Sequence, residues 1–140
     1  MSEVLDLYET CQVLAGGQTA RFVYDREADI LEIVFEDVTA TCAIELTDNI
    51  LLRFDLETEQ AAGLTILDYS ILATPSEIGP RNFPITGLDD LPQAMRQTVL
   101  KIIISPPANQ ILRVSALYST PVQPLPITYV ERSVALTEVA

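Results

Sequence analysis

Residues 21–35 read Arg-Phe-Val-Tyr-Asp-Arg-Glu-Ala-Asp-Ile-Leu-Glu-Ile-Val-Phe, and this stretch decides the fold. Apolar side chains recur at every second position on both sides of a short polar segment, residues 25–28. A two-residue period of this kind is typical of a half-buried β-strand, and a polar interruption is typical of a turn. The stretch therefore predicts a β-hairpin with Leu31, Ile33 and Phe35 on one face.

The same alternation continues further along the chain. Three more apolar runs follow at residues 42–46, 50–55 and 62–66, and polar residues suited to turns separate them. Five short strands at regular spacing predict an antiparallel β-meander over residues 20–70. One face of such a sheet must be covered by another element.

The segment 89–104 predicts the helix that covers this sheet. It opens with Asp-Asp-Leu-Pro, in which an aspartate would cap the helix and the proline would lie in the first turn. Its apolar residues recur at helical spacing: Leu91, Met95, Val99, Ile102 and Ile103. We therefore expect an α+β fold, with an antiparallel β-meander of five to seven strands packed against one main α-helix.

The two ends of the chain extend this unit. Val4, Tyr8 and Cys11 are at helical spacing, so residues 1–19 are expected to form a short helix or a loosely attached arm. Residues 71–140 are expected to hold a proline-rich connector, the helix, and strands near residues 111–118 and 125–134, completing the same domain.

The composition excludes several functions. The chain of 140 residues is 49% hydrophobic and carries a formal net charge of −12, which fits one soluble domain. It contains no histidine, so Ser-His-Asp and Cys-His catalysis within the chain are excluded. Residues 1–70 hold fifteen acidic residues and three arginines and account for all of the net charge. This asymmetry predicts an acidic surface on the first half.

The same properties predict the surroundings of the protein. Scattered lysines and arginines do not form the basic surface that nucleic acids require. The N-terminus is acidic, unlike a signal peptide, and the longest apolar stretch contains Lys101 and is too short to cross a membrane. Cys11 and Cys42 are expected to be reduced thiols of a cytoplasmic protein, with a disulfide between them as the less favoured alternative. We expect no cofactor, no nucleic acid partner and no membrane association.

Residues 21–70 resemble a small bacterial family, domain of unknown function 2283. The residues that carry the resemblance are Asp55 and two stretches, Tyr-Asp-Arg-Glu-Ala-Asp-Ile-Leu at 24–31 and Gly-Leu-Thr-Ile-Leu-Asp at 63–68. The family usually has proline where Arg26 stands and glycine where Thr58 or Glu59 stands, so we expect both turns to differ in shape. The resemblance implies a small antiparallel β-unit without an established activity. Some members lie beside genes proposed to encode toxins and have been proposed as their antitoxin-like partners, so the resemblance implies an antitoxin-like role for this chain.

The acidic pattern Asp25-x-Glu27-x-Asp29, followed by Glu36, is the candidate metal site. Calcium loops place oxygen ligands at alternating positions and end with such a carboxylate. However, Ile30 stands where a calcium loop needs glycine, and the residues after it are expected to form a strand. The preferred interpretation is therefore that Asp25 and Asp29 accept hydrogen bonds from turn amides. No metal ligand and no catalytic residue is assigned.

Three further side chains are candidates for chemistry. Glu32 and Glu45 would form a carboxylate pair if they met on neighbouring strands, with solvent-facing glutamates as the preferred alternative. Cys42 lies in an apolar stretch and is expected to behave as a small hydrophobic residue.

Two functions follow from these observations. The leading hypothesis is a non-catalytic protein-binding or assembly module whose acidic surface faces a basic protein partner. Because the apolar content is high for a small domain, we also expect a homo-oligomer that covers exposed sheet edges. The alternative is a small-ligand or divalent-metal-dependent enzyme that uses Asp25, Glu27, Asp29 or Glu32.

Overall fold

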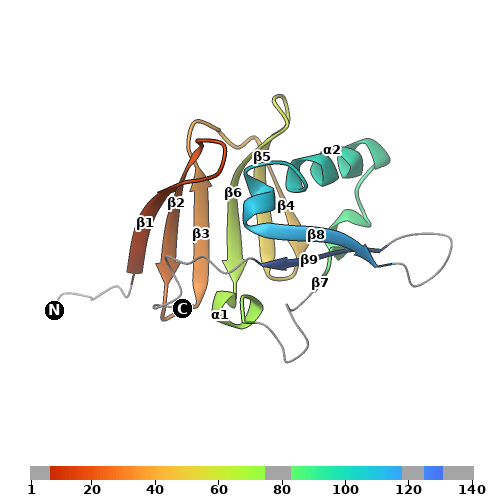
Figure 1. The fold of residues 1–140 in the computed structure, drawn as a ribbon. Coiled ribbons are helices and arrows are strands. Elements are labelled where there is room, and N and C mark those ends of the chain that lie inside the picture. Colours follow the sequence, from red (N-terminus) through yellow and green to blue (C-terminus); the bar gives the residue numbers. More distant parts are fainter. Residues whose placement is uncertain (1–6, 75–82, 118–124, 131–140) are drawn as a thin grey trace.

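The computed structural model describes residues 7–74, 83–117 and 125–130, and it has a mixed α+β fold (Figure 1). Its main element is an antiparallel sheet of six strands. These strands are β1 (Leu7–Val13), β2 (Thr19–Asp25), β3 (Ile30–Phe35), β4 (Cys42–Thr47), β5 (Ile50–Asp55) and β6 (Gln60–Leu67). The antiparallel sheet predicted from the alternation over residues 20–70 is confirmed.

The strands do not lie in the order in which they follow along the chain. Their spatial order is β1-β2-β3-β6-β5-β4. The sheet therefore consists of two three-stranded meanders, β1–β3 and β4–β6, joined where β3 pairs with β6 from Ile30 opposite Leu67 to Val34 opposite Gly63. The sequence predicted the strands and the turns but not this central pairing, since periodicity carries no information about which strands become neighbours.

The N-terminal segment differs from its prediction. Residues 7–13 form a strand, not a helix, and all seven pair with β2. The spacing of Tyr8 and Cys11 suggested a helix, but the strand places these two residues on opposite faces, with Tyr8 partly buried and Cys11 exposed. Pairing with a neighbouring strand thus outweighed a weak local pattern. Residues 1–6 lie outside the described residues, as do parts of the expected connector and of the last strand.

The second half of the chain forms short helices and a second sheet. The helices are α1 (Tyr69–Leu72), η1 (Thr86–Leu88), α2 (Gln93–Ile103) and η2 (Ala108–Gln110), of which η1 and η2 are 3₁₀ turns. The strands β7 (Phe83–Pro84), β8 (Leu112–Leu117) and β9 (Leu125–Val130) pair in the order β7-β9-β8. The two C-terminal strands expected from the sequence are thus present, but they belong to this separate sheet. No helix within the described ranges has the length and apolarity that a membrane span requires.

The longest described helix, α2, starts later than predicted. The sequence placed its start near Asp89 with an aspartate cap, whereas Pro92 is the N-cap residue and makes no side-chain cap hydrogen bond. The preceding turn is held instead by Arg96, whose Nε donates to the carbonyl oxygen of Leu88 at 3.1 Å. Its Nη2 also donates to the carbonyl of Leu91 at 3.1 Å. The predicted aspartate cap is therefore wrong, and an arginine from the first turns takes over the role of closing this end.

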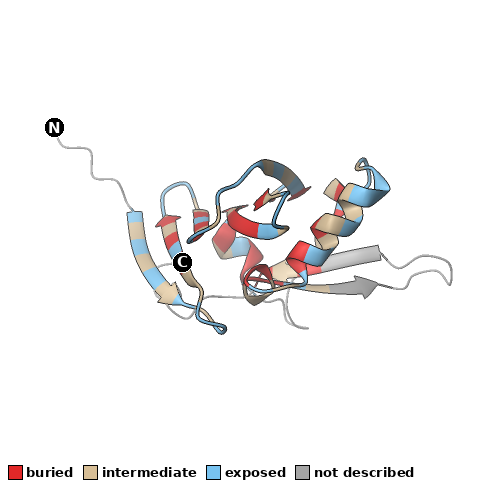
Figure 2. Ribbon diagram, turned by 90° about the horizontal axis from the view of Figure 1, so that it is seen from above, coloured by how far each residue is buried: buried red, intermediate tan, exposed pale blue. Residues whose placement is uncertain are grey.

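One face of the main sheet is covered and carries the core. Val99, Ile102 and Ile103 of α2 are buried in one cluster with the side chains of the sheet, as the helical stripe predicted. Figure 2 shows the buried residues between the sheet and the elements of the second half. The side chains that the strands direct into this cluster include Phe22, Tyr24, Leu31, Ile33, Phe35, Leu52, Phe54, Leu64 and Ile66.

The η1 turn packs on β4, one of the two edge strands of the main sheet. The contact is so close that a Cβ atom on Gly87 would lie 1.6 Å from the carbonyl oxygen of Glu45. Since the obstacle is backbone on both sides, no side-chain rotation can relieve the clash. Glycine at this position is therefore required for η1 to rest on β4.

We predict that Gly87→Ala lowers the free energy of unfolding by about 2–4 kcal/mol, because the methyl group displaces η1 from β4. Urea denaturation measures this change. The control is Thr86→Ala, an exposed neighbour in the same turn, which should change the stability by less than about 0.5 kcal/mol. Equal stability of both variants would contradict the described packing.

Candidate functional site

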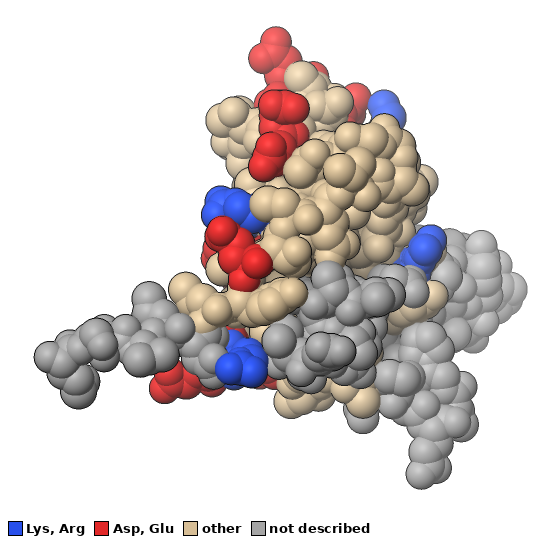
Figure 3. Space-filling view, turned by 60° about the vertical axis from the view of Figure 1, so that its left-hand side comes forward, with Lys and Arg blue, Asp and Glu red and all other residues tan. Residues whose placement is uncertain are grey.

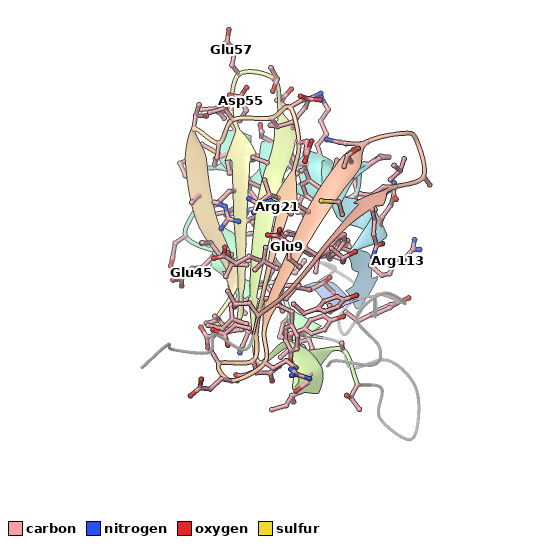
Figure 4. All side chains as sticks on the ribbon, turned by 90° about the vertical axis from the view of Figure 1, so that its left-hand side faces the viewer. Glu9, Arg21, Glu45, Asp55, Glu57 and Arg113 are labelled. Atoms are coloured by element: carbon pink, nitrogen blue, oxygen red, sulfur yellow. The ribbon has the colours of Figure 1, made fainter. Side chains whose placement is uncertain are left out.

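The face of the main sheet opposite α2, named here the open face, is the candidate site. Figure 4 looks onto it, with Glu9, Arg21 and Glu45 in front of the strands and α2 behind them. The strand register aligns one row of paired residues across the sheet: Glu9, Val23, Glu32, Thr65, Leu51 and Glu45. The adjacent row consists of Cys11, Arg21, Val34, Gly63, Arg53 and Ala43.

Charged and apolar side chains alternate on this face. Val23, Val34 and Leu51 are only partly buried, so the apolar part of the face is in contact with solvent. Arg21 Nη1 lies 3.2 Å from Glu9 Oε1, with the two side chains 45% and 58% exposed. A pair this exposed contributes at most about 1 kcal/mol and is open to exchange with other charged groups.

Arg53 lies near the middle of the open face. Its Nη1 donates to Thr65 Oγ1 at 2.6 Å. The guanidinium group lies over Gly63, where a Cβ atom would come within 2.8 Å of Arg53 Nη2 and 2.5 Å of the carbonyl oxygen of Ile33. Among the described residues no carboxylate is within 4.0 Å of this group. Arg53 therefore retains hydrogen-bond donors that can reach a partner's acceptor.

The open face holds two shallow hollows. One, of about 230 Å³, is lined by Leu7, Val23, Asp25, Ile30 and Glu32. The other, of about 200 Å³, lies on the far side of Thr65, and its lining includes Glu45, Asn49, Leu51 and Leu67. Both volumes are below the range of roughly 300–1,000 Å³ usual for small-molecule sites. The face is thus better suited to an extended protein surface than to a small ligand.

Asp29 is the centre of a hydrogen-bond network at one end of the sheet. Its Oδ1 accepts from Tyr24 Oη at 2.7 Å and from the Ser70 amide at 2.9 Å, and its Oδ2 accepts from Ser70 Oγ at 2.7 Å. Its own carbonyl accepts from the Tyr69 amide at 3.1 Å. Asp29 therefore joins the β2–β3 turn to the start of α1, and both carboxylate oxygens are engaged within the chain.

The network shifts the acidity of both partners. Burial raises the pKa of Asp29, but the hydrogen bonds from Tyr24 and Ser70 together lower it by more than burial raises it. The pKa of Asp29 is therefore below its usual value. The pKa of Tyr24 is raised above its usual value, by burial first and then by the hydrogen bond to the Asp29 carboxylate. The arrangement holds Asp29 ionised and Tyr24 protonated at neutral pH.

The side chains of the acidic pattern do not converge on a common point where they could bind one metal ion. Asp25 Oδ1 accepts from the Ala28 amide at 3.1 Å, as the turn interpretation predicted. Glu27 is exposed, and Glu36 follows β3 at the opposite end of the strand from Asp29. In the ranges that the structure describes, no group of three acidic or cysteine side chains is placed to hold a metal ion.

The other acidic residues of the family resemblance also lie at turns. Asp55 accepts from Thr58 Oγ1 at 2.9 Å and from the Glu57 amide at 3.2 Å, and these bonds, the one from Thr58 first, lower its pKa. Asp68 Oδ2 accepts from Asn49 Nδ2 at 2.9 Å. Glu59 has φ of +55°, in the left-handed region that glycine favours.

Glu32 and Glu45 do not form the carboxylate pair that the sequence left open as the less favoured possibility. Glu32 lies on β3 and Glu45 on β4, and β6 and β5 lie between these strands. With neighbouring strands about 4.8 Å apart, their backbones are roughly 14 Å apart. Both glutamates are exposed, in agreement with the alternative interpretation. Cys42 is partly buried and packs against the core, as expected for a small hydrophobic residue.

Sequence reasoning did not identify Arg53 or Ser70 as important. The alternation in β5 placed Arg53 on the outer face, but its position over Gly63 depends on the pairing of β5 with β6. Ser70 reaches Asp29 only because β6 lies beside β3. A local sequence pattern carried no signal for either contact.

Residues 21–70 match the model of a family described as Protein of unknown function (DUF2283), which confirms the resemblance inferred from the sequence. The matched segment runs from β2 to the start of α1 and contains Tyr24, Asp29 and Ser70. No curated protein and no solved structure matches the chain.

We predict that Asp29→Asn lowers the free energy of unfolding at pH 7 by about 1–3 kcal/mol, because charged hydrogen bonds become neutral. Asparagine tolerates the left-handed backbone at this position, where φ is +57°. Since the pKa of Asp29 is lowered in the folded state, its contribution is present above the unfolded pKa of about 3.9 and is lost as the pH falls through the folded pKa. On acidification from about pH 5 to pH 2, the free energy of unfolding of the variant should therefore fall by less than that of wild type.

Urea denaturation over this pH range measures the difference. The control is Asp25→Asn, which keeps an acceptor for the Ala28 amide and should change the stability by less than about 0.5 kcal/mol. Parallel acid profiles for wild type and Asp29→Asn would show that the Asp29 network does not contribute as described.

Proposed function

We propose that the protein is a non-catalytic protein-binding module whose open face receives a basic protein partner. The observation that carries the proposal is a six-stranded sheet with one face covered by α2 and the other, in the described part of the chain, carrying partly exposed apolar side chains between carboxylates. Partly apolar surfaces rimmed by charged groups are typical of protein–protein interaction sites.

The charge distribution supports a basic partner. Carboxylates lie on the open face at Glu9, Glu32 and Glu45 and in the turns at both ends of the sheet. Figure 3 shows acidic side chains interspersed with a few basic ones and with a broad area of other residues. Such a surface attracts a basic protein at long range, while the apolar residues give short-range contact. Arg21 and Arg53, the two arginines described on the open face, would favour one orientation of the bound partner.

The hydrogen bonds that the acidic residues accept within the chain favour binding over catalysis. Asp25, Asp29 and Asp55 accept hydrogen bonds that stabilise turns, so their side chains have a role that requires no reaction. An antitoxin-like role for this chain, implied by the family resemblance, is one form of the proposed binding. We place this binding in the cytoplasm, where the unpaired thiols of Cys11 and Cys42 would stay reduced.

We predict that Leu51→Lys weakens partner binding at least tenfold, because it replaces a partly buried apolar side chain of the open face, between Glu45 and Thr65, by a positive charge. The test immobilises the protein and captures partners from a lysate of the source cells at salt concentrations from 50 to 500 mM. We expect captured proteins to be basic and their binding to weaken with salt.

The matched control is Leu56→Lys, which makes the same change at an exposed residue in the β5–β6 turn. This variant should bind like wild type, and both variants should unfold at similar urea concentrations. Equal binding by the two variants, or binding that does not respond to salt, would refute the proposal.

A further inference from the structure

The two edges of the main sheet are treated differently by the rest of the described chain. At one edge β4 is in contact with η1. At the other, β1 is the outermost strand, and no described strand pairs with its outer side (Figure 1). β1 is seven residues long and contains no proline, lysine or bulge, which are the usual means of protecting an edge.

The hydrogen bonds around β1 show which backbone groups face outward. The Leu14 amide donates to Gln18 at 2.7 Å across the β1–β2 turn, and on the other side of β2 the Glu36 amide donates to Thr19 at 3.0 Å. Backbone groups alternate in direction along a strand, so even-numbered residues of β1 point toward β2. The N–H and C=O groups of Leu7, Glu9, Cys11 and Val13 therefore point to the outer edge.

The next outward-facing residue, Ala15, shows what such an edge binds. Its amide donates to Gln110 Oε1 at 3.1 Å, and its carbonyl accepts from Gln110 Nε2 at 2.8 Å. The side-chain amide of Gln110 thus takes the place of a peptide group from a neighbouring strand. This contact occupies the backbone groups just beyond β1. The part of the edge left available for pairing is therefore Leu7–Val13.

We propose that a second copy of this chain pairs with this edge, β1 against β1 in antiparallel orientation, with the two-fold axis at Thr10. In this register Leu7 lies opposite Val13 of the second copy, and Glu9 lies opposite Cys11. Every outward-facing N–H and C=O of β1 then has a partner. The result is a continuous sheet through both copies with an isologous interface.

The side chains favour this register over its neighbours. A shift of the axis to Glu9 would place two glutamates directly opposite each other, which is destabilising. A shift to Cys11 would place Leu7 opposite Ala15, whose backbone groups are bound to Gln110. Only the register centred on Thr10 uses the whole strand and avoids both conflicts.

The exposed apolar residues of β1 also support a second copy as the occupant. Leu7 is 49% exposed and Val13 is 73% exposed, and both lie on the open face at the two ends of the strand. Self-pairing about Thr10 brings Leu7 of one copy beside Val13 of the other, twice in the dimer. Cross-strand apolar pairs of this kind stabilise a sheet, and so does a Thr–Thr pair at the axis.

This dimer is independent of the partner proposed above, because it uses the edge of the sheet and leaves the open face accessible. It would place two open faces side by side on one continuous sheet. Two linked binding surfaces would strengthen the capture of any partner that reaches both.

The first experiment measures the mass of the full chain by light scattering at micromolar concentration. Wild type should have the mass of two chains. Cys11→Pro should have the mass of one chain, because proline removes an outward N–H that bonds to none of the described residues. Cys11→Val is the matched control and should remain a dimer, and the urea midpoint of each variant shows that its monomer is folded.

A second variant disrupts the interface without altering the backbone. Leu7→Lys combined with Val13→Lys places lysines opposite each other across the proposed axis and should also give the mass of one chain. A wild-type mass of one chain would overturn the proposal, as would a dimer that persists in both the proline and the double lysine variants.

The register is tested by Thr10→Cys in a Cys11→Ser background. Residues on the axis form a non-hydrogen-bonded pair with Cα atoms about 4.5 Å apart, which is within the range for a disulfide. Mild oxidation should therefore link most chains in pairs through Cys at position 10. Failure of a dimeric variant to cross-link would reject this register. Leu51→Lys should remain a dimer, so loss of partner capture and loss of dimerisation are separate results.

Discussion

The hydrogen bonds of Asp29 hold the two meanders of the main sheet together at the place where their strands meet. Asp29 follows the turn between β2 and β3, and Ser70 follows β6, so the two hydrogen bonds between these residues fix β6 beside β3. The rings of Tyr24 and Tyr69 make an edge contact at 5.6 Å over the same junction. The pairing of β3 with β6 sets which residues are neighbours on each face of the sheet. Both the core and the open face therefore depend on this pairing.

Three of the strands that were predicted correctly, β2, β3 and β5, have one deeply buried face. In β2, β3 and β5 every second side chain is fully buried, so the apolar alternation is strong. In β1 the inward side chains, such as Tyr8 and Thr10, are only partly buried, and polar residues are tolerated there. The alternation in β1 is therefore weak, and the spacing of Tyr8 and Cys11 predicts a short helix or a loosely attached arm instead. The cause is its position at the edge of the sheet, which a local pattern does not report.

The candidate site was less accessible to sequence reasoning than the fold. Asp25 was interpreted correctly as a turn residue because its bond to Ala28 is local. Asp29 accepts from Ser70, 41 residues away in sequence, and Glu32 and Glu45 are separated by two strands whose order follows from the β3–β6 pairing. The beginning of α2 was misplaced for a related reason, since the role assigned to an aspartate is taken by Arg96. Contacts within a few residues were predictable, and those that depend on topology were not.

The contact between Arg53 and Gly63 couples two positions that lie on different strands. The guanidinium group occupies the space that a side chain at position 63 would need, and the Ile33 carbonyl closes that space from the other strand. The guanidinium is the flexible end of a long side chain and can move aside, whereas the Ile33 carbonyl is backbone and cannot. The stricter constraint on position 63 therefore comes from β3, and any side chain there would have to displace the strand at which the two meanders join.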